Sequence, residues 1–144
     1  MPQLTLARAD ALIDAALKLG RERQFARLTV AVLDAGGHLV AFKREDGSGI
    51  LRADIAYGKA WGALGMGFSS REISERAVKH PVFYSALFAA SQGRVIPSPG
   101  GVLICDEGGE VIGAVGISGD TGGNDEICAI AGIEAAGLKA RTGA

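Results

Sequence analysis

Along the chain, apolar residues recur with the period of a helix in some segments and form short continuous runs in others. Apolar residues from Leu6 to Leu17 recur at the spacing of one helix face, and Thr5 is suited to cap that helix. Two short runs follow, Leu28 to Leu33 and Leu39 to Phe42, and runs of this length are typical of buried strands. The chain therefore begins with a predicted helix and two predicted strands.

The residues between these two strands belong to a motif that occurs twice. Val30 to Phe42 reads VAVLDAGGHLVAF, and Val102 to Ala114 reads VLICDEGGEVIGA. In each segment an apolar run reaches Asp-x-Gly-Gly and then resumes, and aspartate followed by glycine suits the positive φ of a tight reversal. The motifs lie 72 residues apart in register and predict two hairpins of one sheet.

The chain between the two predicted hairpins is mainly helical in pattern. Ile50 to Gly65 has a helical period, and Ser69 with Glu72 resembles a capping box that opens a further helix. Pro81 is placed in the first turn of a helix that runs through Ala90. Ile96 to Gly101 reads IPSPGG, which predicts a loop because proline cannot donate to a strand ladder.

A last amphipathic helix is predicted after the second hairpin. Asp120 to Asn124 is expected to form a loop, and either Asn124 or Asp125 can cap the helix. Helices around two hairpins predict an α+β fold, with an antiparallel sheet covered by helices. The apolar residues assigned to the last helix are Ile127, Ile130, Ala131 and Leu138.

Composition limits the classes of function. The chain has 144 residues, 48% of them hydrophobic, which is enough for one domain over residues 1–144 with its own core. It has 15 Lys and Arg residues and 16 Asp and Glu residues, which gives a formal net charge of −1. This balance lacks the basic excess that holds a phosphate backbone, so we expect no nucleic acid partner.

The cysteines and the termini give two further expectations. Cys105 and Cys128 lie 23 residues apart, with no Cys-x-x-Cys motif and no His/Cys cluster, so they predict reduced buried thiols and no metal site. No apolar run approaches the ~20 residues that span a bilayer, and the N-terminus lacks the apolar core of a secretion signal. We expect a cytoplasmic protein without a membrane partner.

Three side chains are candidates for binding or catalysis. His38 follows the first Gly-Gly pair, where it is either a solvated surface group or a ligand-binding group. Lys59 lies among small and apolar residues in IAYGKAWGALG. Its ammonium group either reaches water or is held near the core with a lowered pKa suited to base or Schiff-base chemistry. Arg52 shares its helix face, and the two cations would suit a carboxylate-bearing ligand.

Glycines and polar groups near the end of the second hairpin are less specific. Gly113, Gly116 and Gly119 recur every three residues, but inside a predicted strand, so they are no dinucleotide fingerprint. Glycine in a strand more often marks a bulge or the close approach of a backbone or a flat ligand. Ser118 and Asp125 lie near the start of the last helix, where capping explains the carboxylate as well as catalysis does. The chain has no Gly-x-Ser-x-Gly motif, so hydrolase chemistry has no support.

Several of these segments, taken in order, resemble one family. VAVLDAGGHLVAFKREDG, IAYGKAWGA, PGGVLI and VIGAVGISG, with Asp-Glu before the last helix, are similar to the GlcG/HbpS-like family of small bacterial proteins. That family is related to the C-terminal domain of PduO-type corrinoid adenosyltransferases. The resemblance covers Leu4 to Leu138. It implies a five-stranded antiparallel sheet with flanking helices, profilin-like in character, in a homo-oligomer.

The same resemblance suggests ligands and site residues. Some members bind haem and others accompany glycolate or aromatic-degradation genes, so haem is a candidate cofactor. Axial iron ligands could come only from His38, His80, Met66 or a cysteine. The family's recurrent features fall on Asp34, Gly36, Gly37, Arg44, Asp46, Gly47, Lys59, Pro99, Gly100, Gly101, Gly113, Gly116, Ser118, Gly119, Asp125 and Glu126.

Three functions are compatible with these residues. The first is a protein that binds a small ligand, such as haem or another tetrapyrrole, in a pocket where missing Cβ atoms leave room. The second is an enzyme of isomerase or lyase type on a small oxo- or hydroxy-acid, held by Arg44 or Arg52, with Lys59 or Asp125 moving a proton. The third is an assembly or chaperone-like protein without a small ligand.

The first function places its pocket between the Pro99-Gly100-Gly101 loop, the Lys59 helix and the Ser118-Gly119 strand end, and it expects Gly101 to take positive φ. The ligand-binding candidates are His38, Arg44, Arg52, Lys59, Pro99, Gly100, Gly101, Ser118, Gly119, Asp125 and Glu126.

Overall fold

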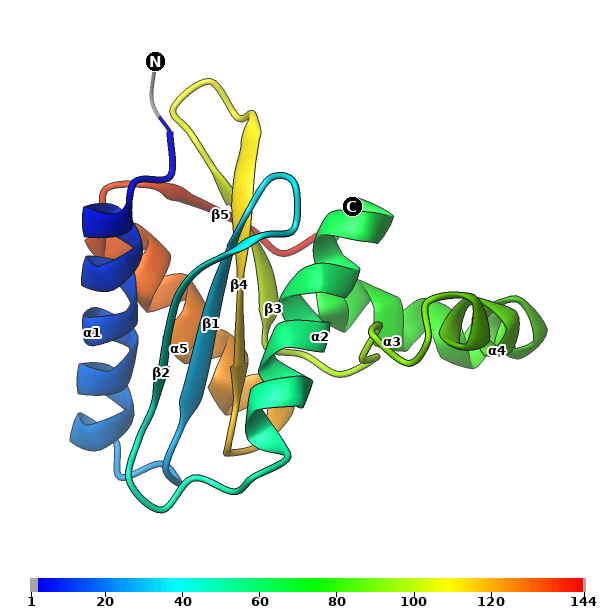
Figure 1. Cartoon of the computed structure of the whole chain (residues 1–144), viewed down its shortest axis with the longest axis horizontal. Coiled ribbons are helices and arrows are strands. Elements are labelled where there is room, and N and C mark those ends of the chain that lie inside the picture. Colours follow the sequence, from blue (N-terminus) through cyan, green and yellow to red (C-terminus); the bar gives the residue numbers. More distant parts are fainter. Residues whose placement is uncertain (1–2, 144) are drawn as a thin grey trace.

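A five-stranded antiparallel sheet lies at the centre of the computed structural model, which describes residues 3–143 (Figure 1). The strand order is β2-β1-β4-β3-β5. This sheet confirms the predicted α+β fold class. The strands are β1 (Thr29–Asp34), β2 (Leu39–Arg44), β3 (Gly101–Cys105), β4 (Val111–Ser118) and β5 (Lys139–Arg141).

Helices cover both faces of this sheet (Figure 1). On one face, α1 (Leu6–Glu22) and α5 (Gly122–Ala135) pack on the inward-facing residues of alternate strand positions, such as Val30 and Val115. On the other face, α2 (Arg52–Met66) packs on Leu33 and its neighbours. Because side chains alternate along a strand, one set of residues faces each layer.

Two short helices extend from the end of α2. They are α3 (Ser70–Lys79) and α4 (Pro81–Ala90), and they project to the side of the sheet (Figure 1). The predicted capping residue opens α3, because the Ser69 hydroxyl accepts the Glu72 N–H at 3.4 Å. Pro81 is at the start of α4, as predicted, where its missing N–H has no helical partner to lose.

The two Asp-x-Gly-Gly motifs form reversals of the same geometry. In each, the aspartate N–H donates to the carbonyl of the residue after the glycines at 2.9 Å, and the second glycine donates to the aspartate carbonyl at 3.0 Å. Gly37 and Gly109 both have φ of +83°, the left-handed conformation predicted for glycine in these turns. The two hairpins therefore share a turn as well as a sequence motif.

The register of the sheet fixes where these turns lie. β1 pairs with β4 so that Asp34 is opposite Gly113 and Thr29 is opposite Ser118. Both reversals consequently lie at one end of the sheet, and Ser118 lies at the other end. The two ends carry different groups of candidate site residues.

Two details at the C-terminal end differ from the sequence-based expectation. Thr121 caps α5, and its hydroxyl accepts the Asn124 N–H at 3.2 Å, so the prediction of a cap at Asn124 or Asp125 is wrong. The predicted helix was also too long, because α5 ends at Ala135 and β5 follows it.

Within residues 3–143, none of the helices combines the length and apolar character needed to cross a bilayer.

Candidate functional site

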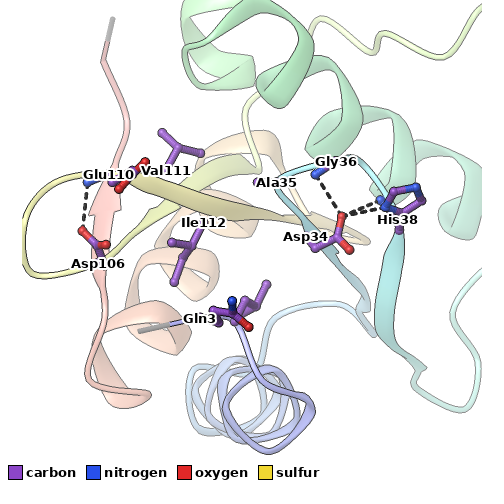
Figure 2. A pocket seen from close by; sticks show the side chains of 10 residues that line it. Gln3, Asp34, Ala35, Gly36, His38, Asp106, Glu110, Val111 and Ile112 are labelled. Carbon is purple, nitrogen blue, oxygen red and sulfur yellow. Dashed lines mark hydrogen bonds and ion pairs between the residues drawn. The ribbon is translucent and has the colours of Figure 1, made fainter. Parts of the chain in front are cut away.

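A cleft of about 490 Å³ lies between the two hairpin turns (Figure 2). The first turn contributes Asp34 and His38 to its lining, and the second contributes Asp106 and Glu110. Apolar side chains complete the lining: Leu4 before α1, and Val111 and Ile112 at the start of β4. A concave site with apolar walls and a few polar groups is the usual form of a small-molecule site.

The carboxylate of Asp34 organises the first turn. Its Oδ1 atom accepts hydrogen bonds from the backbone N–H groups of Gly36 and His38, each at 3.0 Å, and lies 3.1 Å from Nδ1 of the His38 ring (Figure 2). Burial acts to raise the pKa of Asp34, but these hydrogen bonds outweigh it and hold the pKa below its ordinary value. Asp34 is therefore an anion at neutral pH.

This anion determines which nitrogen of His38 carries the proton. An ionised carboxylate only accepts hydrogen bonds, so the Nδ1 atom of His38 must donate to it. In the neutral ring, the lone pair then resides on Nε2. A histidine that ligates a metal usually donates its other ring N–H to a carboxylate, a backbone carbonyl or water. His38 has such a carboxylate partner in Asp34. The His38 side chain is 81% exposed, so its ring is open to solvent at the rim of the cleft.

The second turn has the same scaffold without the imidazole. The Oδ1 atom of Asp106 accepts the Glu110 N–H at 2.9 Å, as Asp34 accepts the N–H of His38 (Figure 2). Glu110 occupies the place that His38 holds in the first turn. The cleft thus lies between two equivalent turns, only one of which carries an imidazole.

A second polar cluster lies at the opposite end of β4. The ammonium group of Lys59 donates to the Asp125 carboxylate at 3.1 Å and to the carbonyl of Ile117 at 2.9 Å. Lys59 is 3% exposed and Asp125 is 1% exposed. The other carboxylate oxygen of Asp125 accepts the N–H of Asp120 at 3.0 Å. The pair joins α2, β4 and α5.

Burial governs the protonation of this pair. Desolvation lowers the pKa of Lys59 and raises the pKa of Asp125, while the attraction between the two charges opposes both shifts. Of the two interpretations of Lys59 from sequence, the structure thus favours the core lysine with a lowered pKa. The ammonium group already holds two partners, and its burial keeps it from water.

The other predicted polar residues are divided among separate contacts. Arg52 donates to the Ser118 hydroxyl at 3.2 Å, beside the Lys59 cluster. Arg44 donates to the Ser48 carbonyl at 2.9 Å. Glu126 pairs with Arg71 of α3 at 3.1 Å. The structure therefore brings Arg52, Lys59, Ser118 and Asp125 together.

The predicted glycines pack against the chain itself. A Cβ atom on Gly101 would overlap the carbonyl of Lys59, and one on Gly119 would overlap the carbonyl of Arg27. Gly100 has φ of +128°, and its Cβ would lie 2.9 Å from the Lys59 ammonium nitrogen. The space expected for a ligand is thus filled by the chain's own atoms. Positive φ occurs at Gly100 and not at Gly101, so the expectation of positive φ at Gly101 is wrong.

The loop before β3 is equally close to its neighbours. If Gly122, at the start of α5, carried a Cβ atom, that atom would lie 2.9 Å from the ring of Pro99. This contact ties the loop to the N-terminal turn of α5. The predicted pocket residues Pro99, Gly100 and Gly101 therefore belong to the packing around the Lys59–Asp125 pair.

His38 lies apart from these residues, because the sheet register places it at the end of β1 that is remote from Ser118. Sequence reasoning singled out His38 and placed Asp34 in the turn, but it missed the contact between them and the walls formed by Leu4, Val111 and Ile112. One signal was present, since Asp34 and His38 are four residues apart across a Gly-Gly reversal. Such a turn brings the two side chains to the same side.

The fold and the cleft define a small α+β protein with a histidine on the rim of a surface site. The chain belongs to the HbpS-like family, described as "Haem degrading protein HbpS-like", which matches residues 4–134. A curated relative from Citrobacter freundii, an uncharacterized 15.0 kDa protein in the dhaT-dhaS intergenic region, is 32% identical over 99 residues. That match covers 69% of this chain and 68% of the relative.

Two solved structures are close in fold. The crystal structure of a PduOC–haem complex has a TM-score of 0.88 and 26% identity, with 98% of this chain and 100% of the other covered. The crystal structure of the Klebsiella pneumoniae protein ORFY has a TM-score of 0.86 and 29% identity, with 95% and 93% covered. Both extend over nearly the whole of this chain.

Proposed function

We propose that this chain is a ligand-binding protein that takes up haem, or another tetrapyrrole, in the cleft between the two hairpin turns. In this proposal, Nε2 of His38 would hold the iron, and Asp34 would orient the ring through Nδ1. The hydrogen bond at 3.1 Å between these two side chains is the observation that carries it. Membership of the HbpS-like family and the haem complex of PduOC support the same ligand class.

The cleft has dimensions and walls that suit such a ligand. Its volume of about 490 Å³ lies within the ~300–1,000 Å³ typical of small-molecule sites. Leu4, Val111 and Ile112 offer apolar contact to a flat ring, and removing that surface from water favours binding. When bound, haem supplies an iron centre that accepts a nitrogen ligand, and the protein supplies that nitrogen in a fixed orientation.

The alternative, an enzyme on a small oxo- or hydroxy-acid, has less support. Its proton-transfer group would be Lys59 or Asp125, and a catalytic group must come within hydrogen-bond reach of its substrate. Both side chains are almost fully buried, and each is bound to the other. The lowered pKa of Lys59 is compatible with base chemistry, but burial in a packed cluster also accounts for it.

Thermal unfolding with a panel of ligands tests the proposed function. The panel is hemin, a cobalamin, glycolate and pyruvate, because a compound that binds the native state raises the melting temperature. We expect hemin to raise it for the wild type and for His80→Ala, the matched change at the other histidine. We expect no such rise for His38→Ala. A wild type that responds to glycolate or pyruvate but not to hemin would support the enzyme instead.

A further inference from the structure

A second cavity, of about 270 Å³, lies between α2 and the end of α4. Its walls are mainly apolar, and Arg94 is the one charged side chain among the described residues that line it. This cavity and the cleft beside His38 share no lining residue within residues 3–143. Its volume lies just below the ~300–1,000 Å³ typical of drug-sized ligands, which suits a smaller molecule. The apolar lining includes Trp61, Gly65, Met66, Leu87, Ala90 and Val95.

Arg94 is held in place by the protein itself. Its Cζ atom lies 4.0 Å from the centroid of the Trp61 ring, and its Nε–H donates to the carbonyl of Ser91 at 2.9 Å. The backbone N–H of Arg94 donates to the same carbonyl at 3.2 Å. A Cβ atom on Gly58 would lie 2.9 Å from the carbonyl oxygen of Arg94, so α2 packs directly on this backbone. A side chain fixed in this way loses little freedom when a ligand binds to it.

The guanidinium group of Arg94 lacks an anionic partner. Stacking on Trp61 uses the flat face of the group, while its N–H donors lie in the plane of the group and point outward. Within residues 3–143, no carboxylate lies at ion-pair distance from Arg94, and the residue is exposed to solvent. Arg76 differs, because it stacks over Phe68 at 4.1 Å but also pairs with Glu72 at 3.1 Å. Arg94 therefore keeps its Nη donors for an anion that comes from outside the protein.

The cavity also has room beside this cation. Gly65 lies in its lining, and a Cβ atom there would meet nothing within 4 Å. An apolar group that enters the cavity leaves water and contacts Trp61 and Leu87, which favours binding. An arginine at the mouth of an apolar cavity suits a molecule with two parts, one anionic and one apolar.

We propose that this cavity binds a small carboxylate with an apolar body, such as a single hydrocarbon ring. Arg94 holds the carboxylate through its Nη donors, in the paired geometry that a guanidinium offers to two oxygens. The apolar body packs against Trp61 and Leu87. The site is separate from the cleft, so the proposal stands independently of what the cleft binds.

The fluorescence of Trp61, the single tryptophan of the chain, reports on this site directly. The probes are cyclohexanecarboxylate and hexanoate, each compared with its neutral amide. We expect each acid to cause a saturable change in emission. We expect each amide to bind about 10-fold more weakly or worse, because it keeps the apolar body but forms no charge-assisted pair. Acids that cause no saturable change, or amides that bind as tightly as the acids, would overturn the proposal.

Variants of the chain locate the binding. Arg94→Gln is expected to weaken binding of the two acids by about 10-fold or more. The matched control is Arg76→Gln, which removes the same charge from an arginine that already has a carboxylate partner and should keep the wild-type affinity. His38→Ala should also keep it, because His38 lies in the other site. Equal losses in Arg94→Gln and Arg76→Gln would reduce the effect to general charge and refute the site.

A variant that fills the cavity tests the apolar part separately. Gly65→Leu places a side chain in the open space and leaves Arg94 unchanged, so it is expected to abolish binding of both acids. The rise in melting temperature caused by each acid provides a readout that does not depend on indole emission, and the melting curves verify that every variant folds. Wild-type affinity in a folded Gly65→Leu variant would place the ligand elsewhere and contradict the proposal.

Discussion

The ammonium nitrogen of Lys59 lies 3.1 Å from a carboxylate oxygen of Asp125, and neither side chain is more than 3% exposed. Each charge compensates the other after both have left water. Removing one partner leaves an uncompensated buried charge, which costs far more than the loss of a surface pair. The first prediction follows from this relationship.

We predict that Lys59→Met lowers the free energy of unfolding by about 3–5 kcal/mol. The matched control is Lys43→Met, because Lys43 pairs with Asp10 and Asp14 on the surface and is 43% exposed. That change is expected to cost less than about 1 kcal/mol. Urea unfolding measures both. Equal urea midpoints for Lys59→Met and the wild type would show that the buried pair is not structural.

The same pair bears on how the enzyme alternative can be tested. The enzyme hypothesis expects Lys59→Ala to abolish turnover while the fold stays intact. Because Lys59 contacts β4 and α5 inside the protein, its removal is expected to affect the fold first. Activity assays on Lys59 variants therefore require a stability measurement beside them.

Close packing of α2 on the sheet gives the second prediction. A Cβ atom on Gly116 would overlap the carbonyl of Ala56 in α2, so Gly116→Ala is expected to destabilise the protein by about 1–3 kcal/mol. The control position is Gly65, which belongs to α2 itself and where a Cβ meets nothing within 4 Å. Gly65→Ala is expected to be neutral or to stabilise by about 0.5–1 kcal/mol. Melting temperatures of the two variants that shift in the same direction would contradict this explanation.

Much of the fold could be predicted because local signals agreed with one another. The repeated Asp-x-Gly-Gly motif specified both reversals, and Ser69 and Pro81 marked the starts of two helices. The strand β5 gave no such signal from its residues. It has three residues, Lys139 to Arg141, and it is fixed by pairing with β3 rather than by an apolar run.

The candidate site was harder to predict, because it depends on which segments meet. Turn residues and His38 were visible in the sequence, but the cleft forms only when sheet pairing brings the two reversals to one end. The glycines misled for a related reason. A missing Cβ indicates that something approaches closely, and here it is the chain's own backbone rather than a ligand: α2 at Gly101 and Gly116, and Arg27 at Gly119.

The third prediction concerns the response to alkaline pH. Burial raises the pKa of the Cys128 thiol from 9.0 to about 11. As the pH rises, the unfolded chain releases this proton before the folded chain does, so the stability present below pH 9 is lost towards pH 11. We expect the free energy of unfolding to fall by about 2 kcal/mol over this interval. Cys128→Ala should flatten that slope, and an equally steep slope in the variant would assign the effect to other groups.

The fourth prediction separates the orientation of His38 from the stability of its turn. Asp34→Asn removes the anion that fixes the ring, and loss of such a partner typically weakens metal binding by about 10–100-fold. Asp106→Asn is the matched control, because Asp106 holds the equivalent turn without an imidazole. Hemin affinity from fluorescence quenching of Trp61 measures both. Equal loss of affinity in the two variants would mean that turn geometry, rather than ring orientation, matters.

Absorption spectroscopy of hemin bound to the protein tests the central claim, that His38 would hold the haem iron. Titration of the wild type is expected to shift the Soret band, and His80→Ala is expected to reproduce that shift. His38→Ala should lose the shift while its circular dichroism spectrum stays that of the folded protein. An unchanged Soret shift in His38→Ala, or a wild type that produces none, would contradict the assignment of the cleft.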